Sequence, residues 1–249
     1  MVWNYLDTGP KPGRFNMELD EAIARKVASG SSLSVLRFFQ WEPYCISLGK
    51  NQKADDIDSG KCREAGIDIV YRPTGGRAIL HADELTYSVI FKDDISGSIE
   101  ETYCRISEAL AKGLRKLGIP AQMAPVQPDF KFLYKQPSSA ACFSSSAKYE
   151  IQVNGKKLVG SAQRRFNGAV LQHGSILIGP YHRRLTEFLN LNEHEKQTMA
   201  TIMADKTIEI DQLKRIDLEV LKFELKKAFE DNFKIDFTEP EEHLISLTV

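Results

Sequence analysis

The chain has 249 residues, of which 42% are hydrophobic and 27% are charged. This apolar content is sufficient for a full-sized core, so the composition excludes a disordered chain and a small disulfide-stapled domain. The 33 lysines and arginines nearly balance the 34 aspartates and glutamates, and no overall charge favours nucleic acid or a membrane surface as a partner. No stretch approaches the roughly 18 apolar residues of a membrane span. We therefore expect a protein that binds neither nucleic acid nor membrane, with a monomer as the default state.

The four cysteines are widely spaced along the chain, at Cys45, Cys62, Cys104 and Cys142. None belongs to a C-x-x-C pair of the kind that holds zinc, so no metal site is expected. The N-terminus lacks a basic stretch followed by an apolar run, which is the pattern of a secretory leader. These features favour a cytoplasmic protein with reduced thiols.

No internal repeat or Pro/Gly/Ser-rich linker divides the chain, so we treat residues 1–249 as a single domain. The first predicted helix begins at Asn16, a suitable N-cap, and ends at Gly30. The apolar runs 34–39 and 45–48 that follow it predict buried strands.

A second helix is predicted from Ser98 to Gly118, because Glu101 stands where a capping box requires it. Residues 148–179 change to a strand pattern with two Asn-Gly turns, which predicts a three-stranded antiparallel meander. Strands and helices occur in groups rather than in alternation, so the fold class is mixed α/β with a mixed or antiparallel sheet. The remaining predicted elements are two short helices (181–190 and 193–203), an amphipathic helix (217–232) and a strand (234–237).

Residues 71–81 read Tyr-Arg-Pro-Thr-Gly-Gly-Arg-Ala-Ile-Leu-His and lead towards an apolar strand. Glycine lets a backbone approach a ligand closely, with its N–H groups facing an anion or a carbonyl, so this segment is a candidate ligand cradle. A Pro/Gly hairpin turn with solvated arginines explains the Gly-Gly pair equally well when the pair is taken alone. The segment is neither a Walker loop nor a G-x-G-x-x-G turn.

Cys142 lies in a run of small residues, 138–146, which would leave its thiol accessible. Most free cysteines are inert packing residues, so a cysteine alone is weak evidence for a nucleophile. Lys157 follows on a predicted hairpin, and the return of the strand could bring its ammonium near the sulfur. Because a nearby cation favours the thiolate, Cys142 and Lys157 are the candidate catalytic pair, with Lys156 on the opposite face of the strand.

Two histidines, His81 and His173, lie closest to these motifs. A lone histidine is more often a hydrogen-bonded packing residue than a catalyst, and this interpretation remains open for both. The other three, His182, His194 and His243, are predicted to lie at the surface.

The motif residues occur in six segments: 72–81, 84–88, 141–143, 149–150, 155–163 and 171–175. Together they resemble the biotin/lipoate protein ligase superfamily, and within it the octanoyltransferases that act on the glycine-cleavage H protein. The resemblance extends from about residue 15 to about residue 210.

The resemblance implies a catalytic domain with a central, largely antiparallel sheet flanked by helices, and a tunnel for an eight-carbon acyl chain beside the Gly-Gly loop. It places the acyl-thioester cysteine on Cys142 and the thiol-activating lysine on Lys157. Octanoyl would arrive as a thioester on acyl carrier protein and leave as an amide on a lipoyl-domain lysine, such as that of H protein, with no cofactor. The implied substrate-binding residues are Arg72, Thr74, Gly75, Gly76, Arg77, His81, Gly160, Ser161, Ala162 and His173.

The main alternative is an ATP-dependent lipoate–protein ligase, which shares the loop and the lysine but forms a lipoyl-adenylate, needs ATP and Mg²⁺, and needs no cysteine. An amidotransferase that moves octanoyl between lipoyl domains ranks third, and a non-catalytic acyl-binding module last. Acidic carrier domains could dock on a basic patch, although an ordinary solvated face is an equally good interpretation. The patch would consist of Lys156, Arg164, Arg165, Arg183 and Arg184.

Overall fold

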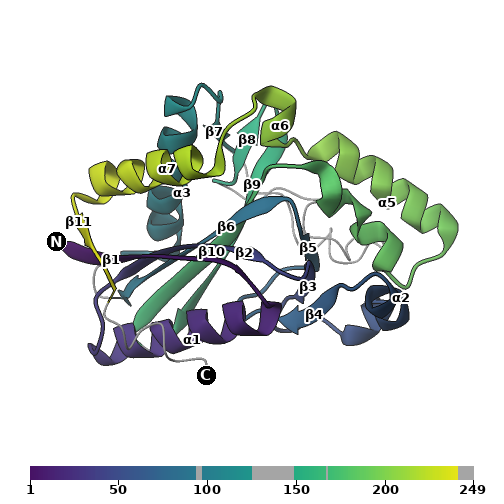
Figure 1. Cartoon of the computed structure of the whole chain (residues 1–249), viewed down its shortest axis with the longest axis horizontal. Coiled ribbons are helices and arrows are strands. Elements are labelled where there is room, and N and C mark those ends of the chain that lie inside the picture. Colours follow the sequence, from purple (N-terminus) through teal and green to yellow (C-terminus); the bar gives the residue numbers. More distant parts are fainter. Residues whose placement is uncertain (94–96, 125–148, 167, 241–249) are drawn as a thin grey trace.

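The structure, a computed structural model, describes residues 1–93, 97–124, 149–166 and 168–240 (Figure 1). Cys142, the small-residue run around it and His243 lie outside the described residues. Within the described part, none of the helices is both long enough and apolar enough to cross a bilayer.

A large twisted sheet runs through the molecule, and its described strands follow the order β11-β1-β2-β6-β10-β9-β8-β7. The β11–β1 and β1–β2 pairs are parallel, and every other neighbouring pair is antiparallel. The prediction of a mixed α/β fold with a largely antiparallel sheet is confirmed. The strands are β1 (Val2–Lys11), β2 (Val35–Trp41), β6 (Glu84–Lys92), β7 (Gln122–Met123), β8 (Ile151–Val153), β9 (Lys156–Phe166), β10 (Ala169–Leu177) and β11 (Asp236–Thr238).

A smaller sheet has the order β4-β3-β5 and carries the segment that leads into the Gly-Gly loop. Its strands are β3 (Cys45–Leu48), β4 (Asp68–Tyr71) and β5 (Ile79–His81). Because β4 ends at Tyr71 and β5 begins at Ile79, residues 72–78 form a loop between two strands that both pair with β3.

Helices cover both faces of the large sheet (Figure 1). α1 (Gly13–Ser29) lies on one face, while α3 (Ile99–Lys116) and α7 (Leu218–Phe233) pack together on the other. The small sheet is flanked by the remaining helices: η1 (Ala54–Asp56), α2 (Ser59–Glu64), the 3₁₀ segment η5 (Pro180–Phe188) and α5 (Glu193–Lys206). The short helix α6 (Ile210–Leu213) connects to α7.

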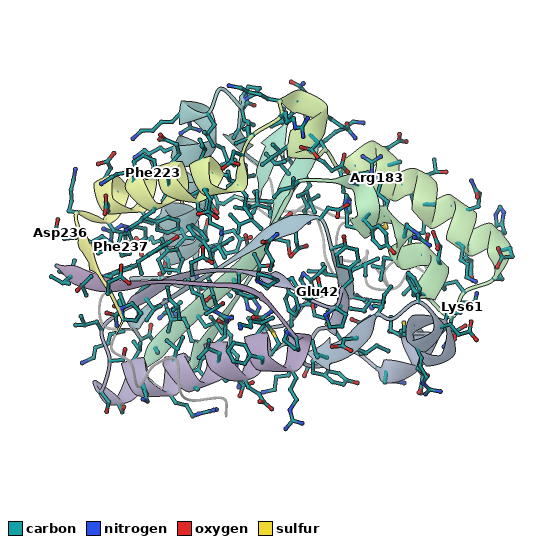
Figure 2. The ribbon with its side chains drawn as sticks, in the orientation of Figure 1. Glu42, Lys61, Arg183, Phe223, Asp236 and Phe237 are labelled. Atoms are coloured by element: carbon teal, nitrogen blue, oxygen red, sulfur yellow. The ribbon has the colours of Figure 1, made fainter. Side chains whose placement is uncertain are left out.

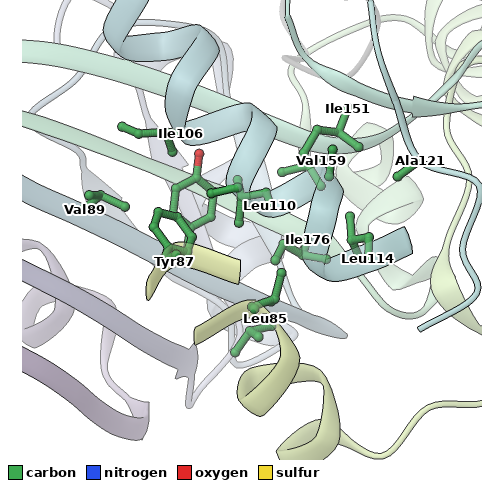
Figure 3. Close-up of a cluster of buried hydrophobic side chains, with 14 of the residues drawn as sticks. Leu85, Tyr87, Val89, Ile106, Leu110, Leu114, Ala121, Ile151, Val159 and Ile176 are labelled. Carbon is green, nitrogen blue, oxygen red and sulfur yellow. The ribbon is translucent and has the colours of Figure 1, made fainter. Parts of the chain in front are cut away.

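The alternation of side chains along β6 explains how the two faces differ. Leu85, Tyr87 and Val89 point towards α3 and pack on its apolar stripe, which includes Ile106 and Leu110 (Figure 3). The residues between them point to the α1 face, which is less uniformly apolar. Thr86, on that face, lines a cavity.

Several predicted signals are present at the element ends. Gly30 ends α1 with φ +78°, a conformation that glycine adopts without strain, and Ser98 and Glu101 form the capping box of α3. Asn154 and Gly155 form the β8–β9 turn with positive φ angles. The meander β8–β9–β10 and the later helices α5 and α7 are likewise confirmed.

Other predictions were wrong in part. α1 begins at Gly13, after Pro12, so Asn16 is not its N-cap but a fully buried residue of the second turn. The segment predicted as a helix over 181–190 is a 3₁₀ helix. The strands β1 and β4 and the helix α2 were not predicted, because β1 combines a Gly-Pro pair with polar residues and β4 has only four residues.

Candidate functional site

A cavity opens on the α1 face of the large sheet, where β9 and β10 meet the small sheet; its empty space, together with the open solvent at its mouth, is about 390 Å³. The strands on both sides contribute small residues, which leave the space between them. The described lining residues are Met17, Trp41, Ser47, Arg72, Ile79, His81, Thr86, Gly160, Ser161, Ala162, His173, Gly174 and Ser175.

The structure brings together six of the residues implied by the resemblance. Arg72 and His81 come from the loop and strand of the small sheet, and Gly160–Ala162 and His173 come from β9 and β10. Thr74 is fully buried and contacts His173, whereas Gly75 and Gly76 are exposed and do not belong to the described lining. Arg77, half-buried, also stays outside that lining.

Arg72 holds the loop rather than projecting into the cavity as a free cation. Its guanidinium donates to the carbonyl oxygens of Ser47 (2.8 Å), Gly75 (3.2 Å) and Arg77 (2.6 Å). It also donates to the Ser47 hydroxyl at 3.0 Å. These bonds tie β3 to both ends of the Gly-Gly turn, so Arg72 stabilises the shape of the loop.

Gly49 lets the loop pass close to the end of β3. A Cβ atom placed on Gly49 would clash with the carbonyl oxygen of Gly76, and the obstructing atoms are backbone. We expect Gly49→Ala to displace the loop and to lower the free energy of unfolding by about 1–3 kcal/mol, as overpacking does. Gly75→Ala is the matched control, because nothing lies within 4 Å of a Cβ at that position. Denaturant unfolding of both variants tests this, and equal stabilities would refute the close approach.

His81 is the centre of a buried hydrogen-bonded chain. Its Nδ1 lies 2.8 Å from Glu84 Oε1 and its Nε2 lies 2.7 Å from the Ser47 hydroxyl oxygen. Its ring stacks on Trp41 with centroids 4.0 Å apart. Arg72 donates to the same Ser47 hydroxyl, so Ser47 links Arg72 to His81 Nε2 while Glu84 holds the other ring nitrogen.

His173 has a second chain of the same design. Its Nε2 lies 2.7 Å from the Thr74 hydroxyl and its Nδ1 lies 3.3 Å from Asp20 Oδ2. Burial lowers the pKa of His173 from its ordinary value, although Asp20 opposes this. The ring is therefore neutral, with Nδ1–H donating to Asp20 and Nε2 accepting from Thr74.

Asp20 is anchored by Arg37, and both side chains are fully buried. Arg37 Nη1 donates to Asp20 Oδ1 at 2.7 Å, and its other N–H groups reach Thr8 and Asn16. Burial opposes ionisation of Asp20, but the Arg37 guanidinium and the His173 ring together outweigh it and lower the pKa of the carboxyl. The buried Asn16 thus accepts hydrogen bonds from Arg37 and does not cap the helix.

Acid should lower the stability of the fold by protonating the buried carboxylates that hold the two histidines. The pKa of Glu84 is also lowered: burial opposes its ionisation, but the His81 ring and two hydroxyls outweigh it. Groups with a depressed folded-state pKa contribute stability that is present above the unfolded value of about 4 and is lost as the pH falls through the folded value. We expect a smaller free energy of unfolding at pH 3 than at pH 7, with a smaller difference in Asp20→Asn. An identical pH dependence in that variant would contradict the assignment.

Lys157 is placed by a bulge in β9. Ile151 pairs with Val159 but Gln152 pairs with Lys157, so Leu158 is an extra residue. Strict alternation would turn Lys157 to the same face as Val159, towards α3. The bulge instead turns it to the face of Gln152, which is the face of the sheet that carries the cavity.

The side chain of Lys157 is 1% exposed and forms an ion pair with Glu150, with Nζ 3.0 Å from Oε2. Glu150 is 4% exposed, so both charges are removed from water together. Lys156 alternates away and is half-buried, as expected. Lys157 does not belong to the described lining of the cavity, and its relation to Cys142 lies outside the described residues.

The three described cysteines are poor nucleophiles at this site. Cys45 and Cys62 are buried, and burial raises the pKa of both thiols, that of Cys62 to about 11. Cys104 lies on α3, on the opposite face of the sheet from the cavity. A thiolate at the cavity would have to come from Cys142.

The structure places His182 and the five candidate docking cations. His182 is 2% exposed and packs against Thr207, so the prediction of a surface position was wrong; burial lowers its pKa to about 4. Four of the five candidate docking cations already have bonds within the chain. Arg164 donates to Pro73 O, and the acidic partners of the others are Asp93 for Arg165, Glu209 for Arg183 (labelled in Figure 2) and Glu187 for Arg184.

The chain is similar in sequence to lipoyl protein ligases and octanoyltransferases. The sequence profile of the lipoyl protein ligase A/B catalytic domain matches residues 12–233. A protein named octanoyltransferase LipM from an Exiguobacterium species is 41% identical over 243 residues, covering 95% of this chain and 87% of that protein. The protein of the same name from Staphylococcus aureus is 37% identical, covering 94% and 86%.

The solved structures agree on the fold. A bipartite lipoate protein ligase from Thermoplasma acidophilum, determined in a study of that ligase and its E2 lipoyl domain, superposes with a TM-score of 0.81. It is 23% identical in sequence, and the match covers 100% of this chain and 91% of that one. At this level of identity the superposition supports the fold of the catalytic domain only.

Proposed function

The chain belongs to the lipoyl protein ligase A/B catalytic domain family, and on that premise we infer that it is an octanoyltransferase of lipoate biosynthesis. The observation that carries this function is the 41% identity, along 95% of the chain, to an octanoyltransferase. The site adds a cavity with an apolar part to its lining and a buried lysine on the same face of the sheet.

The cavity suits an apolar chain. The polar groups around it are bonded to one another: Arg72 with Ser47, His81 with Glu84, and His173 with Asp20. Met17, Trp41 and Ile79 supply apolar surface to the same cavity. A ligand that enters this space therefore gains mainly from apolar burial, about 0.8 kcal/mol per CH₂ group, which an octanoyl tail provides.

In the proposed first step the Cys142 thiolate attacks the carbonyl carbon of an octanoyl thioester on acyl carrier protein. A new carbon–sulfur bond forms, the bond to the carrier sulfur breaks, and the released carrier thiolate takes up a proton. One thioester replaces another, so the step needs no ATP. Lys157 stabilises the thiolate and the oxyanion that forms at the carbonyl oxygen, because it places a cation on the cavity face of β9.

In the proposed second step the neutral amine of a lipoyl-domain lysine attacks the Cys142 thioester. The carbon–nitrogen bond forms, the carbon–sulfur bond breaks, and the proton lost by the amine returns to the cysteine sulfur. An amide is more stable than a thioester, so this step drives the transfer forward. The glycine-cleavage H protein is the proposed acceptor.

The alternative, an ATP-dependent ligase, uses a free acid and ATP instead of an acyl thioester. We expect the protein to modify the acceptor lysine when octanoyl-acyl carrier protein is the only other substrate and ATP is absent, as measured by mass spectrometry of the acceptor domain. Modification that requires free octanoate or lipoate together with ATP and Mg²⁺ would assign the ligase activity instead.

A further inference from the structure

The Gly-Gly loop is fastened to the two sheets by two separate chains of buried groups, and both chains have the order carboxylate, imidazole, hydroxyl. The first runs from Asp20 through His173 to Thr74, which lies in the loop itself. The second runs from Glu84 through His81 to Ser47, and it then continues through Arg72 to the loop.

Each chain begins on a rigid element. Asp20 lies on α1 and is fixed by Arg37 of β2 and by the Ser88 hydroxyl of β6. Glu84 lies at the start of β6, where Thr86 and Ser175 also donate to its carboxylate. These carboxylates therefore have fixed positions before they orient the imidazoles, which is how outer groups orient a functional residue.

Each chain ends on the loop. Thr74 Oγ1 donates to His173, while its carbonyl oxygen accepts from the Lys50 N–H at 2.9 Å. On the other side, Arg72 donates to the carbonyl oxygens of Gly75 and Arg77. The two hydrogen-bonded chains thus end on the same turn of six residues, 72–77.

We propose that His173 and His81 are positioning residues, which act on the acyl carbonyl through the Gly-Gly loop and do not contact it themselves. This inference rests on the proposed octanoyl transfer, because the loop contributes Arg72 to the lining of the cavity that would hold the acyl group. Both ring nitrogens of each imidazole face a partner within the protein, so no ring nitrogen is left for the substrate.

Thr74 offers a matched pair of variants. Thr74→Val keeps the shape of the side chain but removes the hydroxyl, whereas Thr74→Ser keeps the hydroxyl. We expect Thr74→Val to lower kcat for octanoyl transfer about 10- to 100-fold with little change in KM for the octanoyl carrier, because a small displacement of a positioning group costs rate rather than binding. Thr74→Ser should retain most of kcat.

A double variant tests whether His173 acts through Thr74. If it does, adding Thr74→Val to His173→Gln should lower kcat no further than His173→Gln alone. Multiplying losses, or a folded Thr74→Val protein with the kcat of the wild type, would overturn the positioning role.

Two readouts need no turnover. The His173 ring should show the Nδ1–H tautomer in ¹⁵N NMR spectra, and the Lys50 amide should exchange its hydrogen faster in Thr74→Val than in Thr74→Ser. An Nε2–H tautomer, or equal exchange in the two variants, would refute the chain from His173 to the loop. Failure of the wild type to transfer octanoyl would instead refute the proposed function, and the NMR and exchange results would stand independently of it.

Discussion

Lys157→Met is expected to abolish most octanoyl transfer and also to destabilise the fold. The substitution removes the ammonium that compensates the Glu150 carboxylate, and both side chains are almost completely buried. Breaking a buried ion pair by removing one partner costs about 3–5 kcal/mol. Removing a donor that stabilises an oxyanion costs about 10²- to 10³-fold in kcat. Denaturant unfolding and a transfer assay measure the two effects separately.

A second substitution separates the two roles of Lys157. Adding Glu150→Gln to Lys157→Met removes the uncompensated charge, so most of the lost stability should return. The transfer rate should stay low, because the amine is still missing. A double variant with wild-type transfer would show that Lys157 only supports the fold.

Arg37→Met is expected to cause the largest loss of stability away from the lysine, about 3–5 kcal/mol. The guanidinium is fully buried and compensates Asp20, and it also bonds Thr8 and Asn16. Without it the Asp20 carboxylate remains buried next to the neutral His173 ring. Denaturant unfolding at pH 7 provides the measurement.

Arg25→Met is the matched control for this prediction. Arg25 lies on the same element as Asp20 and pairs with Glu21 at 3.2 Å, but its side chain is 65% exposed. Exposed ion pairs contribute about 0–1 kcal/mol, so this variant should remain close to the wild type. Similar losses in Arg37→Met and Arg25→Met would refute the compensating role of Arg37.

The elements with local signals could be predicted from the sequence. The capping box at Ser98, the left-handed end at Gly30 and the Asn154-Gly155 turn each depend on residues that are close together in the chain. Strands without such signals were missed, because β1 gains its stability from pairing with β2 and β11 rather than from its own residues.

The cavity was predictable only in part, because its residues come from segments that are far apart in the sequence. The resemblance pointed to the loop and to β9 and β10. It included Glu84 without giving it a role, and it did not include Asp20. One signal was available: Arg37 interrupts an apolar strand, and Asp20 occupies the apolar side of a helix. Charged residues at positions that the pattern assigns to the core indicate a buried ion pair. Which residues pair depends on how α1 packs on the sheet, and local sequence patterns do not specify this.

The bulge in β9 shows why side-chain alternation alone does not predict the face of the sheet to which Lys157 points. Alternation along 156–162 assigns Lys157 to the α3 face together with Val159, and the extra residue Leu158 reverses this. One inserted residue thus decides which face of the sheet carries the lysine. No local residue preference marks the position.

The most direct test of octanoyl transfer through a cysteine is the intact mass of the full chain after mixing with octanoyl-acyl carrier protein in the absence of ATP. The account predicts the gain of one octanoyl group that hydroxylamine removes, as it does from a thioester, and no gain in Cys142→Ala. An equal gain in Cys142→Ala, or a wild-type protein that acquires an acyl group only when ATP is supplied, would contradict it.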